Sequence, residues 1–163
     1  MGNSEIKEPF HSGEVYYLWT YLHQTKESIV TIQVARNHTE DKDLKIFLDE
    51  ILENNFNEEE QQVEAILKES GIRLPPAPPD KPNVEIQDIP AGARFNDPEV
   101  ARLIQKELKA GQLLCSYMMG MSSQEIIKSL FEEFHSQKAE FEQKLLGITK
   151  DKGWYTSPPI NLK

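Results

Sequence analysis

The feature that most constrains the fold of this chain is a proline-rich segment near its middle. The stretch from Ile72 to Phe95 reads IRLPPAPPDKPNVEIQDIPAGARF and holds six of the ten prolines. Proline has a fixed φ and no amide hydrogen, so this stretch cannot continue a helix. Extended at about 3.1 Å per residue, it spans more than about 40 Å, and a helix of about 30 residues is about 45 Å long. We therefore expect residues 72–95 to form a crossover that runs the full length of a helical bundle.

Two helices are predicted before the crossover, over residues 12–36 and 39–70, with Ser12 and Thr39 as N-caps. In both segments apolar residues recur mostly at steps of three and four, which places them on one face. They are Val15, Leu18, Leu22, Ile29 and Ile32 in the first helix, and Leu48, Leu52, Phe56, Val63, Ile66 and Leu67 in the second. Gly71 is a natural stop for the second helix.

Two further helices are predicted after the crossover, over residues 97–120 and 122–152. The first has Asp97 as its expected N-cap and Pro98 in its first turn. The second is expected to begin with a capping box formed by Ser122 and Glu125. Their apolar faces comprise Leu103, Ile104, Leu108, Leu114 and Met118, and then Ile127, Leu130, Phe134, Phe141, Leu145 and Ile148.

The lengths of the links predict the topology. About two residues join the helices within each pair, and such short links force antiparallel neighbours. The predicted fold is therefore all-α, a ferritin-like four-helix bundle in which two antiparallel hairpins are joined by the proline-rich crossover, with residues 1–163 as one domain. Two separate hairpins on a flexible tether are disfavoured, because each would leave its apolar face exposed.

Three sequence stretches resemble a known family. The opening GEVYYLWTYL, the segment LKESGIRLPP before the crossover, and the terminal LLGITKDKGWYTSPP together resemble ferritin-like proteins of spore-forming bacteria related to spore coat protein F. The resemblance covers about residues 13–159 and implies a ferritin-like bundle and a link to sporulation or the spore surface. It supplies no catalytic residues.

Charge and composition exclude several classes of partner. The net charge is -9, so an anionic nucleic acid or lipid surface would be repelled. No apolar run approaches the roughly 20 residues that cross a bilayer, and the N-terminus has no signal-peptide core. Met1-Gly2-Asn3-Ser4 begins like a myristoylation signal, but Ile6 stands where Ser or Thr is required. With a single cysteine, a cytoplasmic location is expected.

Glu132 and His135 have the Glu-x-x-His spacing of carboxylate-bridged di-iron centres. Such a centre needs a second Glu-x-x-His in the bundle, and the other one in this chain, Glu8 to His11, precedes the first helix. With Ile127 and Phe134 at heptad position a, Glu132 and His135 fall at outer positions. We interpret the pair as solvated.

A degenerate polar layer inside the bundle is the remaining candidate for a metal site. Glu59 falls at an inward position, and Gln137, Glu107 and Thr25 fall on or beside the apolar faces of the other helices. Such a layer must be hydrogen-bonded or it costs stability. A satisfied polar layer is the favoured interpretation, because one carboxylate would ligate iron poorly.

Other conspicuous residues have structural interpretations. Cys115 lies among apolar neighbours with no base beside it, which indicates a buried thiol, and Met118, Met119 and Met121 are typical core-filling methionines. Tyr16, Tyr17, Trp19 and Tyr21 cannot all face inward, so some pack under the crossover or form an oligomer contact. Trp154 and Tyr155 are expected to fold back on the end of the bundle.

These patterns predict no catalytic, cofactor-binding or metal-binding residues and no cofactor. The expected function is non-enzymatic: a structural or interaction protein, associated with the spore coat, in which the ferritin-like metal site is lost. Protein partners or self-association are expected, without nucleic acid or membrane. Two alternatives stay open, a metal-binding protein or oxidase with a divergent di-metal centre, and a binder of small apolar ligands between the helices.

Overall fold

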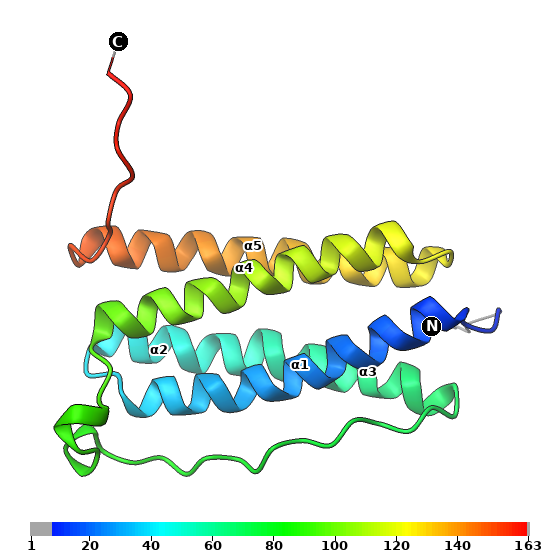
Figure 1. Cartoon of the computed structure of the whole chain (residues 1–163), viewed down its shortest axis with the longest axis horizontal. Helices are drawn as coiled ribbons and strands as arrows, with labels where there is room; N and C mark the ends of the chain where they lie inside the picture. Colours follow the sequence, from blue (N-terminus) through cyan, green and yellow to red (C-terminus); the bar gives the residue numbers. More distant parts are fainter. Residues whose placement is uncertain (1–7, 163) are drawn as a thin grey trace.

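The computed structural model describes residues 8–162, and these residues form four long helices and no strand (Figure 1). The first helix is α1, Ser12–Asn37, and the second consists of α2, Lys42–Ile51, the π-helical turn η1, Leu52–Phe56, and α3, Asn57–Glu69. The last two are α4, Asp97–Met121, and α5, Glu125–Asp151. The prediction of an all-α helical bundle is confirmed. The candidate myristoylation signal lies outside the described residues.

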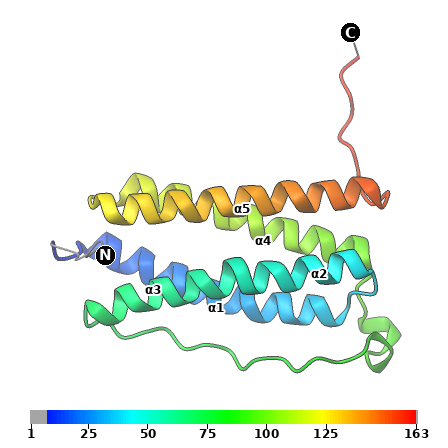
Figure 2. The ribbon, with the colours of Figure 1, turned by 180° about the vertical axis from the view of Figure 1, so that it is seen from behind.

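The helices lie roughly parallel to one axis, and the chain between α3 and α4 runs beside them from one end of the bundle to the other (Figures 1 and 2). This segment contains two short 3₁₀ turns, η2, Ile86–Asp88, and η3, Ala91–Ala93. Within residues 8–162, no helix is both long and apolar enough to span a bilayer.

Polar side chains of α1 hold the segment between α3 and α4. Trp19 Nε1 donates to the carbonyl of Arg73 at 3.0 Å. The side-chain amide of Asn37 makes two hydrogen bonds to the segment. Its Nδ2 donates to the carbonyl of Pro82 at 3.0 Å, and its Oδ1 accepts from the amide of Val84 at 3.1 Å. Of the two alternatives for the aromatic residues of α1, Trp19 follows the first, since it packs against this segment.

The core consists of two apolar clusters, one toward each end of the bundle. One contains Ile32, Leu48 and Ile104, and the other contains Leu22, Val63 and Phe131, with further residues from every helix in each cluster. Buried polar side chains from η1, α3 and α5 lie between the two clusters, in the middle of the bundle.

The predicted N-caps of the first and third helices are each wrong by one residue. His11 caps α1 in a capping box with Glu14, and Asn96 caps α4 in a capping box with Glu99. Asp97 has another role, because its carboxylate accepts from the backbone amides of Glu40 and Asp41 at 2.9 and 3.1 Å. It thereby ties the α1–α2 turn to the start of α4.

The predicted N-caps of the second and fourth helices are also wrong. Asp41, not Thr39, caps α2, and its side chain accepts from the amide of Leu44. The expected capping box at Ser122 is absent from the start of α5, which has Gln124 at its N-cap position and begins at Glu125. The Ser122 hydroxyl instead donates to the buried carboxylate of Glu14, linking the α4–α5 turn to α1.

The second helix is not the continuous α-helix predicted for residues 39–70. Its buried positions Ile51, Asn55, Glu59, Val63 and Leu67 recur every four residues, a longer step than the 3.6 residues of an α-helical turn. The wider π-helical turn η1 absorbs the difference. It thereby keeps α2 and α3 facing the same core.

The inner face of α5 also differs from the predicted heptad. Leu130 and Gln137, expected on or beside the inner face, are only partly buried, and their neighbours Phe131 and Lys138 are buried instead. The reason is that α5 packs on α4 along its length and also on α2 and η1. This arrangement rotates its buried stripe by one residue.

Candidate functional site: a buried ionic layer in the middle of the bundle

Two oppositely charged side chains meet in the centre of the bundle. Glu59 of α3 is 1% exposed and Lys138 of α5 is 2% exposed, and the Lys138 ammonium donates to Glu59 Oε2. The Tyr21 hydroxyl of α1 donates to the other carboxylate oxygen. Lys138 Nζ also lies 3.0 Å from Oδ1 of Asn55, in η1. The layer is thus built from three of the four helices.

A glycine on α4 makes room for the lysine. A Cβ added at Gly111 would lie 2.5 Å from Cε and 2.7 Å from Cδ of Lys138, closer than real Cβ contacts come. A lysine side chain normally yields to such a contact because it is flexible, but the far end of this one is held by Asn55 and Glu59. Gly111 therefore determines the path by which Lys138 reaches the layer.

The surroundings of the ion pair are mostly aromatic and dry. Lys138 Nζ lies 4.7 Å from the ring centre of Phe56 and 5.9 Å from that of Tyr21. The Tyr21 ring in turn contacts Phe131 edge-on at 4.8 Å. A ring face attracts a cation, and the attraction is larger where water is excluded.

Burial shifts the acid–base properties of the layer. Burial raises the pKa of Glu59 above the ordinary 4.5, although the Lys138 charge and its hydrogen bond act in the opposite direction. The pKa of Tyr21 is well above 10 because of burial and the nearby Glu59 carboxylate. Burial also raises the pKa of Cys115 to about 11. Its thiol is therefore protonated and unreactive at neutral pH, as expected for a structural cysteine.

The layer contains one unsatisfied group. Among residues 8–162, the side-chain nitrogen Nδ2 of Asn55 is the buried polar atom that has no hydrogen-bond partner. A small cavity of about 50 Å³ lies on the other side of Lys138, between α1 and α4, and is lined in part by Thr25, Glu107 and Gly111. Buried polar groups are nearly always paired, so an unpaired amide at this position requires an explanation.

The predicted polar layer is therefore right in part. Glu59 and Thr25 are buried as expected, but the Thr25 hydroxyl donates to the Tyr21 carbonyl of its own helix. Glu107 is only partly buried, where it binds Ser28, and Gln137 bonds to Glu133 on the surface. The sequence reasoning missed Lys138, Tyr21 and Asn55. The spacing of Lys138 from Phe131 and Leu145, seven residues on each side, was the signal that could have placed it inside.

The layer does not match a carboxylate-bridged di-metal centre. That centre uses four carboxylates and two histidines that point inward, whereas this layer offers one carboxylate that is already neutralised by an ammonium group. Glu132 is exposed and His135 is partly exposed. No cluster of three or more metal-ligating side chains occurs within residues 8–162.

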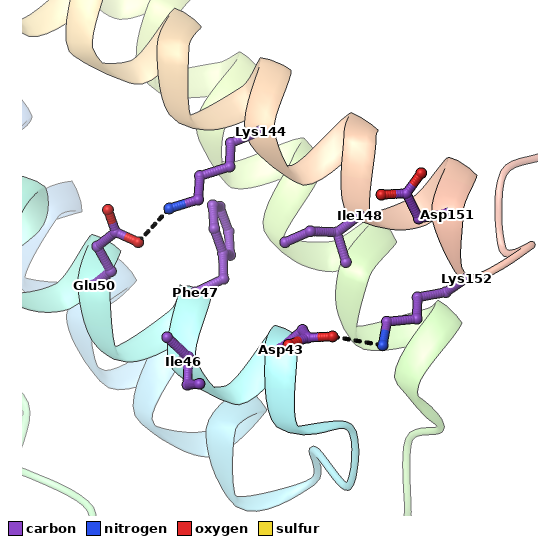
Figure 3. Close-up of a pocket in the computed structure, with 8 residues that line it drawn as sticks. All are labelled: Asp43, Ile46, Phe47, Glu50, Lys144, Ile148, Asp151 and Lys152. Carbon is purple, nitrogen blue, oxygen red and sulfur yellow. Dashed lines mark hydrogen bonds and ion pairs between the residues drawn. The ribbon is translucent and has the colours of Figure 1, made fainter.

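Two of the surface grooves are seams between helices. Figure 3 shows the groove of about 460 Å³ between α2 and α5, where Lys144 binds Glu50 and Lys152 binds Asp43, each at 2.6 Å. These ion pairs join α2 and α5, the two walls of the groove. A more apolar groove of about 420 Å³ lies toward the other end, between α3 and the start of α5, and includes Ile66 and Leu130.

The aromatic residues of α1 divide between the core and the surface. Tyr21 is buried, whereas Tyr16 is 62% exposed and contacts Tyr17, which in turn packs on Tyr117 of α4. Tyr117 is 52% exposed and the nearby Leu113 is 73% exposed. This α1–α4 patch, Tyr16, Tyr17, Leu113 and Tyr117, is an exposed apolar surface. At the other end Trp154 packs on the core, as expected, and Tyr155 remains exposed.

Two relatives match nearly the full length of the chain. The "Uncharacterized protein YvdQ" of Bacillus subtilis (strain 168) is 44% identical over 156 residues, which cover 96% of this chain and 91% of that protein. A crystal structure described as a "putative spore coat protein" from Bacillus halodurans C-125 is 41% identical and superimposes with a TM-score of 0.92. The superposition covers 96% of this chain and 98% of that one.

A family model described as "Protein of unknown function (DUF3231)" matches residues 2–163. Because this match spans almost the whole chain, the protein belongs to that family.

Proposed function

We propose that this protein is a non-enzymatic structural or interaction protein of the spore coat, built as a ferritin-like bundle whose metal site has been lost. The observation that carries the proposal is the position of Lys138. Its ammonium group pairs with the central carboxylate, Glu59, from within the bundle. The full-length similarity to a structure described as a spore coat protein supports the location.

The charges of the layer favour loss of the metal. In a ferritin-like centre, metal cations neutralise a cluster of inward carboxylates. Here a covalently attached cation already neutralises Glu59, and a metal ion placed beside it would be repelled by Lys138. The layer thus has the electrostatics of a structural ion pair.

The α1–α4 patch is the surface that best supports a protein partner or self-association. Exposed aromatic residues are enriched at interfaces because they bury a large area at a small cost in side-chain entropy. The location that fits this role is cytoplasmic, with association with the spore. The overall negative charge opposes a nucleic-acid partner.

Metal analysis tests the absence of a metal centre. The protein is purified from cells grown with added iron and manganese, and bound metal is measured per chain. We expect far less than one metal per chain, in the native protein and in the variant Glu59→Ala. About two metals per chain, lost in Glu59→Ala but retained in the surface variant Glu58→Ala, would overturn the proposal in favour of an oxidase.

Fractionation of spores tests the location. A tagged full-length protein is produced from its own promoter in a spore-forming host that carries the gene, and the coat, cortex and core fractions are probed separately. We expect the tag in the coat fraction of mature spores. A tag confined to vegetative cytoplasm or to the spore core would overturn the coat assignment.

A further inference from the structure

We propose that Lys138 and Asn55 form an intramolecular isopeptide bond, with Glu59 as the group that carries the proton between them. The proposal goes beyond the structural role and does not rest on it. It would make this buried layer a site of covalent self-modification that joins η1 to α5.

The nucleophile and the electrophile are already adjacent. Lys138 Nζ donates to Oδ1 of Asn55 at 3.0 Å, so the amine is in direct contact with the amide whose carbon it would attack. Both side chains are buried, so bulk water does not compete for the carbon. The packed helices and Gly111 hold the lysine in this position, and such fixed geometry accelerates an intramolecular reaction.

The departing group is free to leave. Within the described residues 8–162, Nδ2 of Asn55 is the buried polar atom with no hydrogen-bond partner. It would leave as ammonia, so the reaction removes the one unsatisfied group in the layer. The π-helical turn η1 is what turns Asn55 inward, and π-bulges are frequent at functional sites.

The ion pair supplies the free amine. Only an unprotonated amine attacks a carbonyl carbon, and Lys138 donates directly to Glu59. Burial raises the pKa of the Glu59 carboxyl group, which makes its carboxylate a stronger base than an exposed one. The carboxylate can therefore accept one proton from the ammonium and release the free amine.

The reaction balances without any co-reactant. Glu59 accepts a proton from the Lys138 ammonium, and the amine lone pair forms a bond to Cγ of Asn55 while the C=O electrons move to Oδ1. The attacking nitrogen loses its second proton and Nδ2 gains one, with Glu59 as the carrier. The C–Nδ2 bond then breaks, the carbonyl reforms, and the products are one secondary amide, one ammonia and a protonated Glu59. In the linked form the site is therefore still neutral and still offers a metal no charged carboxylate. Asn55 and Glu59 are four residues apart, which places their side chains side by side on the helix.

Mass measurement of the full chain tests the proposal directly. The denatured protein is weighed intact and after digestion. We expect an intact mass lower than the sequence mass by one ammonia, and a branched peptide in which the segment with Asn55 is joined to the segment with Lys138. A full sequence mass after prolonged incubation of the folded protein would overturn the proposal. So would an ammonia loss that maps to a linear peptide.

Three variants identify the participants. Asn55→Asp should form the same link with loss of one water in place of ammonia. Glu59→Gln should keep its full sequence mass, and Lys144→Gln, which removes an exposed lysine of the same helix, should still lose one ammonia. A branched peptide that survives in Lys138→Met would overturn the assignment. The mass of the native chain decides the proposal by itself, so the test remains decisive even if a variant misfolds.

Discussion

At the scale of single residues, the layer depends on the buried charge of Lys138, which neighbouring groups have to compensate. Removing one partner of a buried ion pair typically costs about 3–5 kcal/mol, because the other charge is left unpaired. Lys138 has Asn55, Glu59 and two aromatic rings around its end group. Gly111 is the residue that lets the lysine reach them.

The substitution Gly111→Ala tests that role. Alanine favours a helix over glycine by up to about 1 kcal/mol, so a helix with free space should be stabilised. At Gly111 the new methyl group would force Lys138 away from Glu59, and we expect a net loss of about 1–3 kcal/mol in the free energy of unfolding. Urea denaturation measures it.

The matched control is Gly147→Ala in α5, where an added Cβ meets nothing within 4 Å. This variant should be neutral or slightly stabilised. Equal stabilisation of both variants would mean that Lys138 can leave the layer at no cost.

Sequence patterns could reveal part of the site and not the rest. Glu59 follows the spacing of the apolar residues in its helix, so its inward position was predictable. Lys138 was not, because a heptad assignment makes Gln137 the inward residue and an uncompensated lysine is rarely buried. Its burial makes sense only once Glu59, Asn55 and Gly111 are known to face it, and these residues come from two other helices, the second helix and α4.

At the scale of elements, η1 sets the relation between α2 and α3. A π-helical turn holds one residue more than the α-helical turn it replaces. In this helix the extra residue brings Asn55 inward and leaves Glu53 and Asn54 exposed. The buried faces of α2 and α3 stay aligned on either side.

Deleting one residue tests this account of η1. Removal of Asn54 should convert the turn to regular α-helix while the flanking faces stay aligned, so the bundle should remain folded with a small loss of stability. Removal of Gln61, an exposed residue in the regular part of α3, should rotate Val63 and Leu67 by about 100° out of the core. Exposing each of these side chains costs about 1.5–3 kcal/mol. Thermal unfolding monitored by circular dichroism compares the stability of the two deletion variants. An equal loss of stability in both would contradict the π-turn account.

Element positions were predictable to within a few residues, but their caps were not. Ser12 and His11, or Asp97 and Asn96, offer two neighbouring capping groups, and local sequence does not choose between them. The choice depends on distant partners, since Asp97 is engaged by the α1–α2 turn and Ser122 by Glu14. The π-turn was also hidden, because a step of four residues is compatible with an ordinary helix over any short window.

At the scale of the whole molecule, hydrogen bonds from α1 attach the segment between α3 and α4 to the bundle. The side-chain amides of Asn37 and Gln33 each make two hydrogen bonds to this segment, one as donor and one as acceptor. Six prolines reduce the freedom of this segment when it is released, which lowers the entropy lost on docking.

The substitution Asn37→Ala should free the middle of the segment without unfolding the helices. We expect cleavage near Val84 by a nonspecific protease to accelerate about tenfold, since losing the pair of hydrogen bonds costs about 1–3 kcal/mol. The far-ultraviolet circular dichroism spectrum should be unchanged. Thr31→Ala is the control, because that exposed hydroxyl bonds only within α1. An unchanged cleavage rate in Asn37→Ala would mean that the two Asn37 hydrogen bonds do not hold the segment.

The path of the chain also places the start of α1 and the end of α5 far apart. Four antiparallel helices would bring the start and the end of the bundle to the same side, but the lengthwise return between α3 and α4 reverses the second pair. Ser12, where α1 begins, and Asp151, where α5 ends, therefore lie at opposite ends (Figure 1). Groups joined at these two points are held apart by about the 39 Å length of a 26-residue helix, so the bundle has the geometry of a rigid strut.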